Sequence, residues 1–267
     1  MTLNSLPFKV VVVLVSMLLL TSLVSAAEVT EIKVFLGLAL SPALQELGPE
    51  FERATGNKVV TVLGASMGET PEAIPNRLRR GEPADVVIMV GSALDKLIEQ
   101  GKVLPATRVD LARSGIAMAV RAGAPKPDIS SVDAFKRTLL AAKSIAYSDS
   151  ASGVYLSTDV FPRLGIADQL KGKSSKIFAE PVGQVVARGE AEIGFQQMSE
   201  LFPVPGIDIV GPLPPGLQKI TVFSAGVVAS SKNPEAAKAL LRYLTSPAAA
   251  PVITKTGMEP ATPADKK

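Results

Sequence analysis

Short runs of β-branched and other apolar residues alternate with amphipathic stretches along most of the chain after residue 30. The runs EIKVFL, KVVTVL and DVVIMV contain few polar residues, which is typical of strands in a covered sheet. The segments between them repeat apolar residues at helical spacing and often end at a glycine. We predict strands at 31–36, 58–63, 85–90, 116–120, 144–147, 176–179, 192–196 and 220–228. We predict helices at 42–55, 71–80, 93–100, 132–142, 154–164, 181–188 and 234–245.

This alternation of strand and helix predicts an α/β fold with mostly parallel sheets flanked by helices. The apolar runs at 113–121 and 220–228 are candidates for chain crossings between two lobes joined by a hinge. We therefore expect one lobe from residues 27–112 with 229–261, a second lobe from residues 113–228 including the crossing strands, and a flexible tail at 262–267.

The first 26 residues have the pattern of a cleaved signal peptide. Lys9 precedes a continuous apolar run, and small side chains follow that run up to Ala26 and Ala27. The apolar run is short for a membrane span. We therefore predict a secreted, periplasmic protein.

Composition narrows the chemistry that the chain can perform. Hydrophobic residues make up 47% and charged residues 20%, which is enough apolar material for a packed core. The chain has no Cys and no His, which excludes disulfides, cysteine nucleophiles, Ser–His–Asp triads and zinc sites of the usual kinds. We expect no metal and no cofactor. The net charge is +3, and the short basic cluster Arg77, Arg79 and Arg80 is typical of a solvated helix face. We therefore expect no binding of nucleic acid. We also expect a monomer.

Several predicted helices begin with hydroxyl residues or glycine directly after a strand. Such loops occur at 36–42, 63–71, 148–153 and 180–183, two of them in each predicted lobe. In a parallel sheet the carboxyl ends of strands meet at one edge, where ligands bind. Free N–H groups at helix starts and serine hydroxyls favour an anion. The four loops therefore predict a cleft that closes on a small anion.

Other polar residues near these loops give weaker indications. Arg113 lies at the first predicted crossing, where its guanidinium could pair with a carboxylate or simply face solvent. Gln196 and Gln197 follow a strand and could supply amide donors. Asp149 beside two serines is compatible with a hydrolase, but no general base with a suitable partner is visible in the sequence.

Five local motifs, in this order, resemble the periplasmic molybdate-binding proteins, which are type II solute-binding components of ABC transporters. The resemblance extends from Lys33 to Gly257. It is carried by Val34-Phe35 before a small-residue loop, Gly81-Glu82-Pro83-Ala84-Asp85-Val86-Val87, Ser152-Gly153-Val154-Tyr155, Arg188-Gly189-Glu190-Ala191-Glu192-Ile193-Gly194 and Tyr243-Leu244-Thr245-Ser246-Pro247.

In that family two serines, backbone N–H groups of two helix starts and a tyrosine hold a tetrahedral oxyanion. Carried over by position, the serines fall on Ala39 and Ser66, the backbone donors on Ser152 and Val182, and the tyrosine on Gln197. Two of the three side-chain donors are therefore absent, and an unpaired anion oxygen costs roughly 1–3 kcal/mol. The predicted ligand-binding residues are Ala39, Leu40, Ser66, Met67, Ser152, Gly153, Val182, Gln197 and Arg113.

The resemblance implies a non-enzymatic periplasmic binding protein that captures molybdate, tungstate or an organic carboxylate and delivers it to an inner-membrane ABC permease. The substituted donors favour a carboxylate as a serious alternative to molybdate. Two other functions stay open at this point: an exported enzyme acting on a small anionic substrate, and a periplasmic sensor on the same fold.

Overall fold

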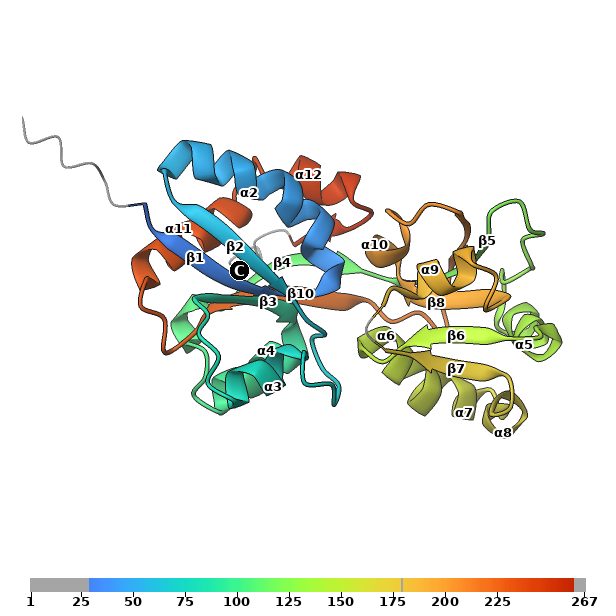
Figure 1. Cartoon of the computed structure of the whole chain (residues 1–267). Helices are drawn as coiled ribbons and strands as arrows, with labels where there is room; N and C mark the ends of the chain where they lie inside the picture. The colour runs from blue at the N-terminus through green and yellow to red at the C-terminus, as the bar shows by residue number, and fades with distance from the viewer. Residues whose placement is uncertain (1–28, 179, 262–267) are drawn as a thin grey trace, which may run out of the picture.

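The protein folds into two lobes that each contain one β-sheet with helices on its faces, as the computed structural model shows for residues 29–178 and 180–261 (Figure 1). The strand order is β11-β4-β10-β3-β1-β2 in the first sheet and β7-β6-β8-β5-β9 in the second. The predicted two-lobed α/β fold is confirmed. The predicted signal peptide, the predicted tail at 262–267 and Ala179 at the end of one predicted strand lie outside the described residues.

The first lobe is built from both ends of the described chain. Its strands are β1 (Glu31–Leu36), β2 (Lys58–Leu63), β3 (Val86–Val90), β4 (Val109–Ser114), β10 (Thr221–Val227) and β11 (Glu259–Pro260). Its helices are η1 (Leu38–Leu40), α2 (Ser41–Thr55), α3 (Ile74–Arg79), α4 (Gly91–Glu99), η2 (Pro105–Thr107), α11 (Pro234–Leu244) and α12 (Ala250–Lys255). In Figure 1, α2, α11 and α12 cover one face of the sheet, and α3 and α4 cover the other.

The second lobe comes from the middle of the chain. Its strands are β5 (Ile116–Arg121), β6 (Ile145–Ser148), β7 (Ser174–Ile177), β8 (Ile193–Gln197) and β9 (Ile207–Pro212). Its helices are α5 (Val132–Ala141), α6 (Ala151–Tyr155), the π-helical turn η3 (Leu156–Val160), α7 (Phe161–Arg163), α8 (Ala167–Leu170), α9 (Val182–Ala187) and α10 (Met198–Leu201).

Each lobe has its own apolar core around a central strand. Every residue of β3 is buried, as its unbroken apolar run predicts, and β3 lies between β1 and β10. In the second lobe, the rings of Phe135 and Phe195 pack edge to face, and their centroids lie 5.8 Å apart. Full burial of one such side chain contributes about 1.5–3 kcal/mol. Each core therefore stabilises its own lobe and positions the loops that face the other lobe.

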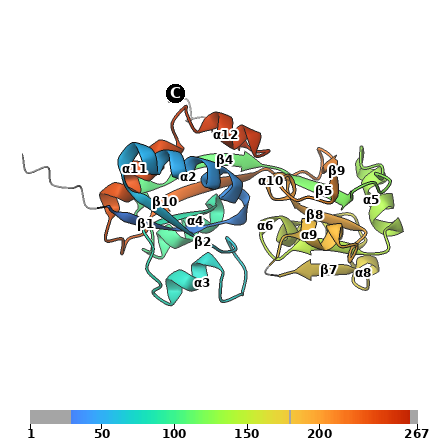
Figure 2. The ribbon, with the colours of Figure 1, turned by 45° about the horizontal axis from the view of Figure 1, so that its top comes forward.

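Two chain segments join the lobes, and Figure 2 shows both running side by side between the sheets. Gly115 separates β4 from β5, and residues 213–220 separate β9 from β10. The Gln218 side chain ties the segments together: its Nε2 donates to the Ile116 carbonyl at 2.9 Å, and its Oε1 accepts from the Ile116 N–H at 2.9 Å. A Cβ at residue 115 would lie 3.1 Å from this amide, so glycine suits the position.

The sheets are mixed, which differs from the prediction of mostly parallel strands. β1 pairs in parallel with β2 and β3, and β6 with β7 and β8, whereas β10 and β5 make antiparallel pairs. The reason is that β4, β5, β9 and β10 run into or out of a crossing. Because all of β10 belongs to the first sheet, the second crossing ends before Thr221, whereas the predicted boundary was 228.

Several short elements differ from the prediction. β4, β9 and β11 were not predicted, nor were α8, α10 and α12. The helix predicted at 71–80 begins only at Ile74, and the one predicted at 154–164 begins at Ala151 and contains a π-helical turn. Among the described residues, no helix is both long enough and apolar enough to cross a bilayer.

Candidate functional site

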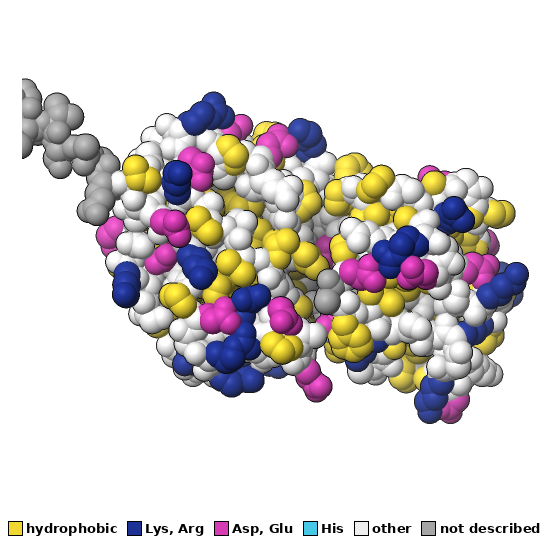
Figure 3. Space-filling model, in the orientation of Figure 1, with side chains coloured by type: hydrophobic (Ala, Val, Ile, Leu, Met, Phe, Trp, Pro, Cys, Tyr) yellow, Lys and Arg dark blue, Asp and Glu magenta, His cyan; other side chains and the backbone are white. Residues whose placement is uncertain are grey.

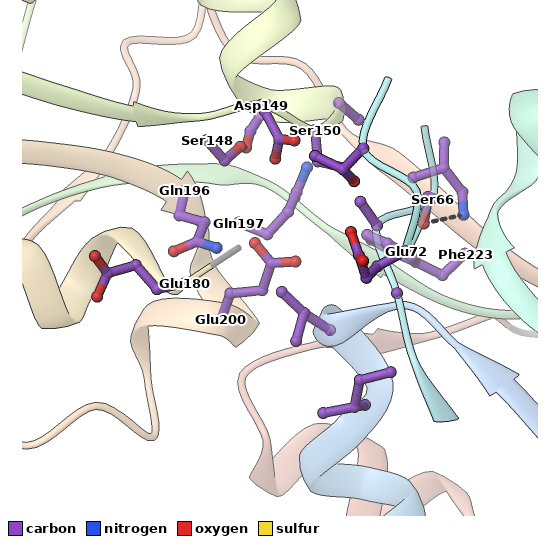
Figure 4. Close-up of a pocket in the computed structure, with 18 residues that line it drawn as sticks. Ser66, Glu72, Ser148, Asp149, Ser150, Glu180, Gln196, Gln197, Glu200 and Phe223 are labelled. Carbon is purple, nitrogen blue, oxygen red and sulfur yellow. Dashed lines mark hydrogen bonds between the residues drawn. The ribbon is translucent and has the colours of Figure 1, made fainter. Parts of the chain in front are cut away.

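A cavity of about 220 Å³ lies between the two lobes, and both contribute to its wall. The first lobe supplies the loops that follow β1 and β2, and the second supplies the loops that follow β6, β7 and β8 (Figure 4). β7 and β8 are both parallel to β6, so these three loops leave the same edge of the sheet. The predicted position of a ligand site at the carboxyl ends of strands agrees with this cavity.

Four acidic side chains line the cavity, and among its described lining residues none is Lys or Arg. Glu72 comes from the first lobe and is exposed. Glu180 is paired with Arg188, whose guanidinium nitrogens lie 2.9 and 3.1 Å from its carboxylate oxygens. Asp149 and Glu200 come from the second lobe and are only partly exposed. Figure 4 shows both of these side chains beside the cavity, across from Glu72.

Glu200 has the most perturbed acid group of the cavity. The pKa of its carboxyl is raised from 4.5 to about 7, mainly by burial and to a smaller extent by the negative charge of Asp149. Hydrogen bonds from the Gln196 side chain and the Gln197 backbone act in the opposite direction. The Oε1 atom of Gln196 accepts from the Val182 N–H at 2.9 Å, which fixes the amide that reaches Glu200. A carboxyl that titrates near neutral pH can both accept and return a proton.

Asp149 follows the end of β6 and faces the first lobe. Burial raises the pKa of its carboxyl, while its own backbone N–H and the charge of Lys176 lower it. A Cβ at Gly68 of the first lobe, which has a φ of 113°, would lie 3.4 Å from Asp149 Oδ2. The two lobes therefore lie next to each other at this point.

Serine hydroxyls supply the neutral donors of the site. Ser66 Oγ accepts from the Val90 N–H at 3.1 Å, which leaves its own hydrogen available for a ligand. The hydroxyls of Ser148 and Ser152 lie 3.0 Å apart, and Ser150 lines the same wall. Hydroxyl groups from both lobes can thus hydrogen-bond carboxylate oxygens in the cavity.

Of the predicted ligand-binding residues, three line the cavity: Ser66, Ser152 and Gln197. Ala39 and Leu40 are buried in the first lobe's core, and Leu38 is the residue of their turn that lines the cavity.

The other predicted residues lie outside the cavity wall. Met67 lines two neighbouring hollows, and Arg113 is paired with Val222 in the first sheet. Gly153 is buried, and the Val182 N–H already donates to the Gln196 side chain.

The Gln197 amide forms hydrogen bonds with the two chain crossings. With the amide oriented to satisfy both of its atoms, its nitrogen donates to the carbonyls of Ser114 at 3.1 Å and Gly115 at 3.3 Å. Its oxygen accepts from Thr221 Oγ1 at 3.0 Å. Gln197 therefore connects the second lobe to both chain crossings, and these bonds occupy the amide that was expected to contact a ligand.

Sequence reasoning did not single out Glu200, Glu72 or Glu180, and it set Asp149 aside. Glu200 follows the end of β8 by three residues, so its place after a strand was the available signal. The raised pKa depends on how the lobes pack around it, which the sequence pattern does not contain. Among the described residues, no three acidic side chains are arranged to hold a metal ion.

Two sheet-containing lobes, two crossings and an inter-lobe cavity define the class of the type II periplasmic binding proteins. The sequence profile of the bacterial extracellular solute-binding proteins matches residues 32–259. The chain therefore belongs to this family, in agreement with its resemblance to the molybdate-binding proteins.

Individual relatives refine this picture. An aconitate isomerase from Pseudomonas sp. is 56% identical over 240 residues, which cover 90% of this chain and 92% of that protein. The molybdate-binding protein ModA of Azotobacter vinelandii is 25% identical over 88% of this chain and 92% of its own. The solved structure of the periplasmic molybdate-binding protein of Azotobacter vinelandii has a TM-score of 0.68 at 24% identity, with 85% of this chain and 98% of that chain covered.

The relative that is 56% identical contradicts one prediction. We expected a protein without enzymatic activity, but a protein named as an enzyme shares more than half of its residues with this chain over nearly its whole length. The absence of His and Cys suggested binding alone. However, the carboxyls of Asp149 and Glu200 can serve acid–base chemistry without either residue type.

Proposed function

We propose that this protein is an isomerase that interconverts the cis and trans forms of aconitate, the anion of propene-1,2,3-tricarboxylic acid. The observation that carries the proposal is the 56% identity to an aconitate isomerase, which covers at least nine tenths of both chains. The inter-lobe cavity supports it, because it joins neutral hydrogen-bond donors to two carboxyls of raised pKa.

The reaction requires a proton to move. A carbon–carbon double bond does not rotate freely, but aconitate has a methylene group next to its alkene. Removal of a methylene proton gives an allylic carbanion, which the adjacent carboxylates stabilise. Return of a proton to the former alkene CH shifts the double bond, and either geometry can result. One C–H bond breaks and one forms, so no oxidant, reductant or second reactant is needed.

The cavity holds two kinds of group that this reaction uses, neutral hydrogen-bond donors and a carboxyl base. Ser66, Ser148, Ser150 and Ser152 can donate to substrate carboxylates from both sides. A partly buried carboxyl of raised pKa can remove the proton, because a base is most effective when its pKa lies near the working pH. Closure of the lobes would exclude water and strengthen each of these interactions.

The proposed enzyme acts outside the inner membrane. The predicted signal peptide at 1–26 and the family of extracellular solute-binding proteins support this location.

Delivery of a captured anion to an ABC permease is a second candidate function. The family match and the molybdate-binding relative favour it. It needs release to a membrane partner, whereas the isomerase needs only substrate and product in solution.

The test uses the chain without residues 1–26, mixed separately with cis- and trans-aconitate and followed by proton NMR. We expect both samples to reach the same equilibrium mixture at a rate proportional to protein concentration. Heat-inactivated protein is the control. Calorimetry with molybdate, tungstate, sulfate and both aconitates measures binding alongside. Tight binding of an anion without interconversion of aconitate would contradict the isomerase and favour delivery.

A further inference from the structure

We infer that Glu200 is the base that removes and returns the substrate proton, and that Gln196 is the positioning residue that holds its carboxylate. This inference rests on the proposed function and assigns the residue that performs its chemical step. The described wall of the cavity offers four carboxyl groups for the role, and their contacts distinguish them.

Two of the four are poorly suited to accept a proton from carbon. Glu180 forms a two-pronged ion pair with Arg188, at 2.9 and 3.1 Å, which occupies both of its carboxylate oxygens. Glu72 is exposed on the loop after β2. Neither carboxyl is therefore both shielded from solvent and free of a charged partner.

Asp149 and Glu200 remain, and they differ in how they are held. Asp149 lies beside Gly68 of the opposite lobe, with the positive charge of Lys176 nearby. The Gln196 side chain and the Gln197 backbone are the polar neighbours that lower the pKa of the Glu200 carboxyl. Both belong to the same lobe as Glu200, whereas Gly68, beside Asp149, belongs to the other lobe.

The Gln196 side chain is itself held in place by its surroundings. The Val182 N–H donates to Gln196 Oε1 at 2.9 Å, so the other end of that amide presents its N–H groups to Glu200. Gln196 is 2% exposed and lies in the buried strand β8, which leaves its amide little freedom. Glu200 and Gln196 also line a second cavity, of about 270 Å³.

In the proposed step, a Glu200 carboxylate oxygen takes one proton from the substrate methylene carbon. The electron pair of the broken C–H bond enters the allylic system and the adjacent substrate carboxylates, whose oxygens accept from the serine hydroxyls. The protonated Glu200 then gives its proton to the other end of the allylic system, the carbon that was the alkene CH. The carboxylate is regenerated, and the double bond has moved by one position.

The experiment compares four single substitutions, E200Q, E99Q, D149N and Q196M, by the NMR assay and by calorimetry with aconitate. E200Q keeps size and hydrogen bonding but cannot accept a proton, and we expect kcat to fall by roughly 100-fold or more while the binding constant changes only a few-fold. E99Q removes a carboxylate from the exposed end of α4, outside the cavity, and should leave kcat unchanged. D149N tests the competing assignment. Thermal melting checks that each variant folds.

The pH profile separates a base from a merely structural residue. The wild-type kcat should decline as pH falls below about 7, because protonation of Glu200 removes the base. Q196M removes a hydrogen bond that lowers the pKa of Glu200, so its acid limb should move to higher pH. D149N should keep an acid limb.

Two results would overturn the inference. An E200Q variant with kcat within threefold of E99Q would show that Glu200 is not the base, and so would loss of the acid limb in D149N but not in E200Q. In either case the wild-type protein still isomerises aconitate, so the proposed function survives. A wild-type protein that leaves aconitate unchanged would overturn both.

Discussion

The carboxyl of Glu200 ties the chemistry of the cavity to the stability of the fold. It retains its proton up to about pH 7 in the folded protein, whereas its ordinary pKa is 4.5. Between these values the folded state binds more protons than the unfolded state. The free energy of unfolding contributed by this group therefore decreases as pH rises from 4.5 to 7 and is constant above that range.

E200Q should remove this pH-dependent contribution. We expect E200Q to gain stability relative to the wild type as pH rises from 5 to 8, by up to roughly 3 kcal/mol. Guanidinium unfolding of both proteins at the two pH values measures the difference. E99Q should show no such trend, and an E200Q difference that stays constant with pH would contradict the buried, protonated state of Glu200.

At the residue scale, sequence reasoning identified donors more readily than bases. Ser66 and Ser152 were predicted from helix starts and strand ends, and both line the cavity. Glu200 was not predicted as a site residue, and Gln197 was predicted to contact a ligand although it bonds the crossings. Both roles depend on contacts between segments that are distant in the sequence. A glutamate on a short helix has no distinctive pattern until the packing around it is known.

At the scale of elements, the contact between α6 and β6 fixes one wall of the cavity. An ideal Cβ at Gly153 would lie 1.7 Å from the Ser148 carbonyl oxygen, so the helix start is packed directly against the strand end. This close approach keeps Ser148 and Ser152 within 3.0 Å of each other. Glycine at 153 is required by the packing, not by an unusual φ.

Substitution of Gly153 by alanine should therefore displace α6. We expect G153A to lower stability by about 1–3 kcal/mol and to weaken aconitate turnover, because the serine wall moves. Gly48 is the matched control: a Cβ there has no atom within 4 Å outside its own helix, so G48A should be neutral or stabilising by up to about 1 kcal/mol. Chemical denaturation measures both. Equal effects at the two glycines would contradict the packing argument.

Elements were predictable where the hydrophobic pattern is long and regular. The predicted strands at 31–36 and 58–63 match β1 and β2 in both bounds, and the buried run of β3 was recognised. β9 lies in a proline-rich segment, and α10 has only four residues, too few to show helical spacing. The second lobe's half of the site lies largely on such short elements, which explains why the fold was more predictable than the site.

At the scale of the molecule, the two lobes are joined only through the β4–β5 and β9–β10 segments within the described chain. Basic and acidic side chains are interspersed over both lobes on the face shown in Figure 3, so no large field of one sign covers it. The position of one lobe relative to the other therefore depends on local contacts at the crossings, and Gln197 makes several of them.

Loss of the Gln197 amide should loosen this connection. Q197A leaves the Ser114 and Gly115 carbonyls and the Thr221 hydroxyl without this partner, and we expect a loss of about 1–3 kcal/mol in stability. Small-angle scattering should show a smaller radius of gyration on addition of aconitate to the wild type, and a weaker change in Q197A. Q100A, on the exposed end of α4, is the control. An unchanged radius in the wild type would contradict closure.

In the proposed isomerase, the two crossings also limit the rate of turnover. A cavity whose walls belong to different lobes admits substrate and releases product only when those walls separate. Each catalytic cycle then includes one opening movement, on the microsecond-to-millisecond scale typical of hinged domains. A slow opening of the lobes suits a carrier, which must hold its ligand. In the proposed enzyme the same opening becomes the step that limits kcat. Variants selected for faster turnover should therefore accumulate changes at Gly115 and residues 213–220 as well as at the base.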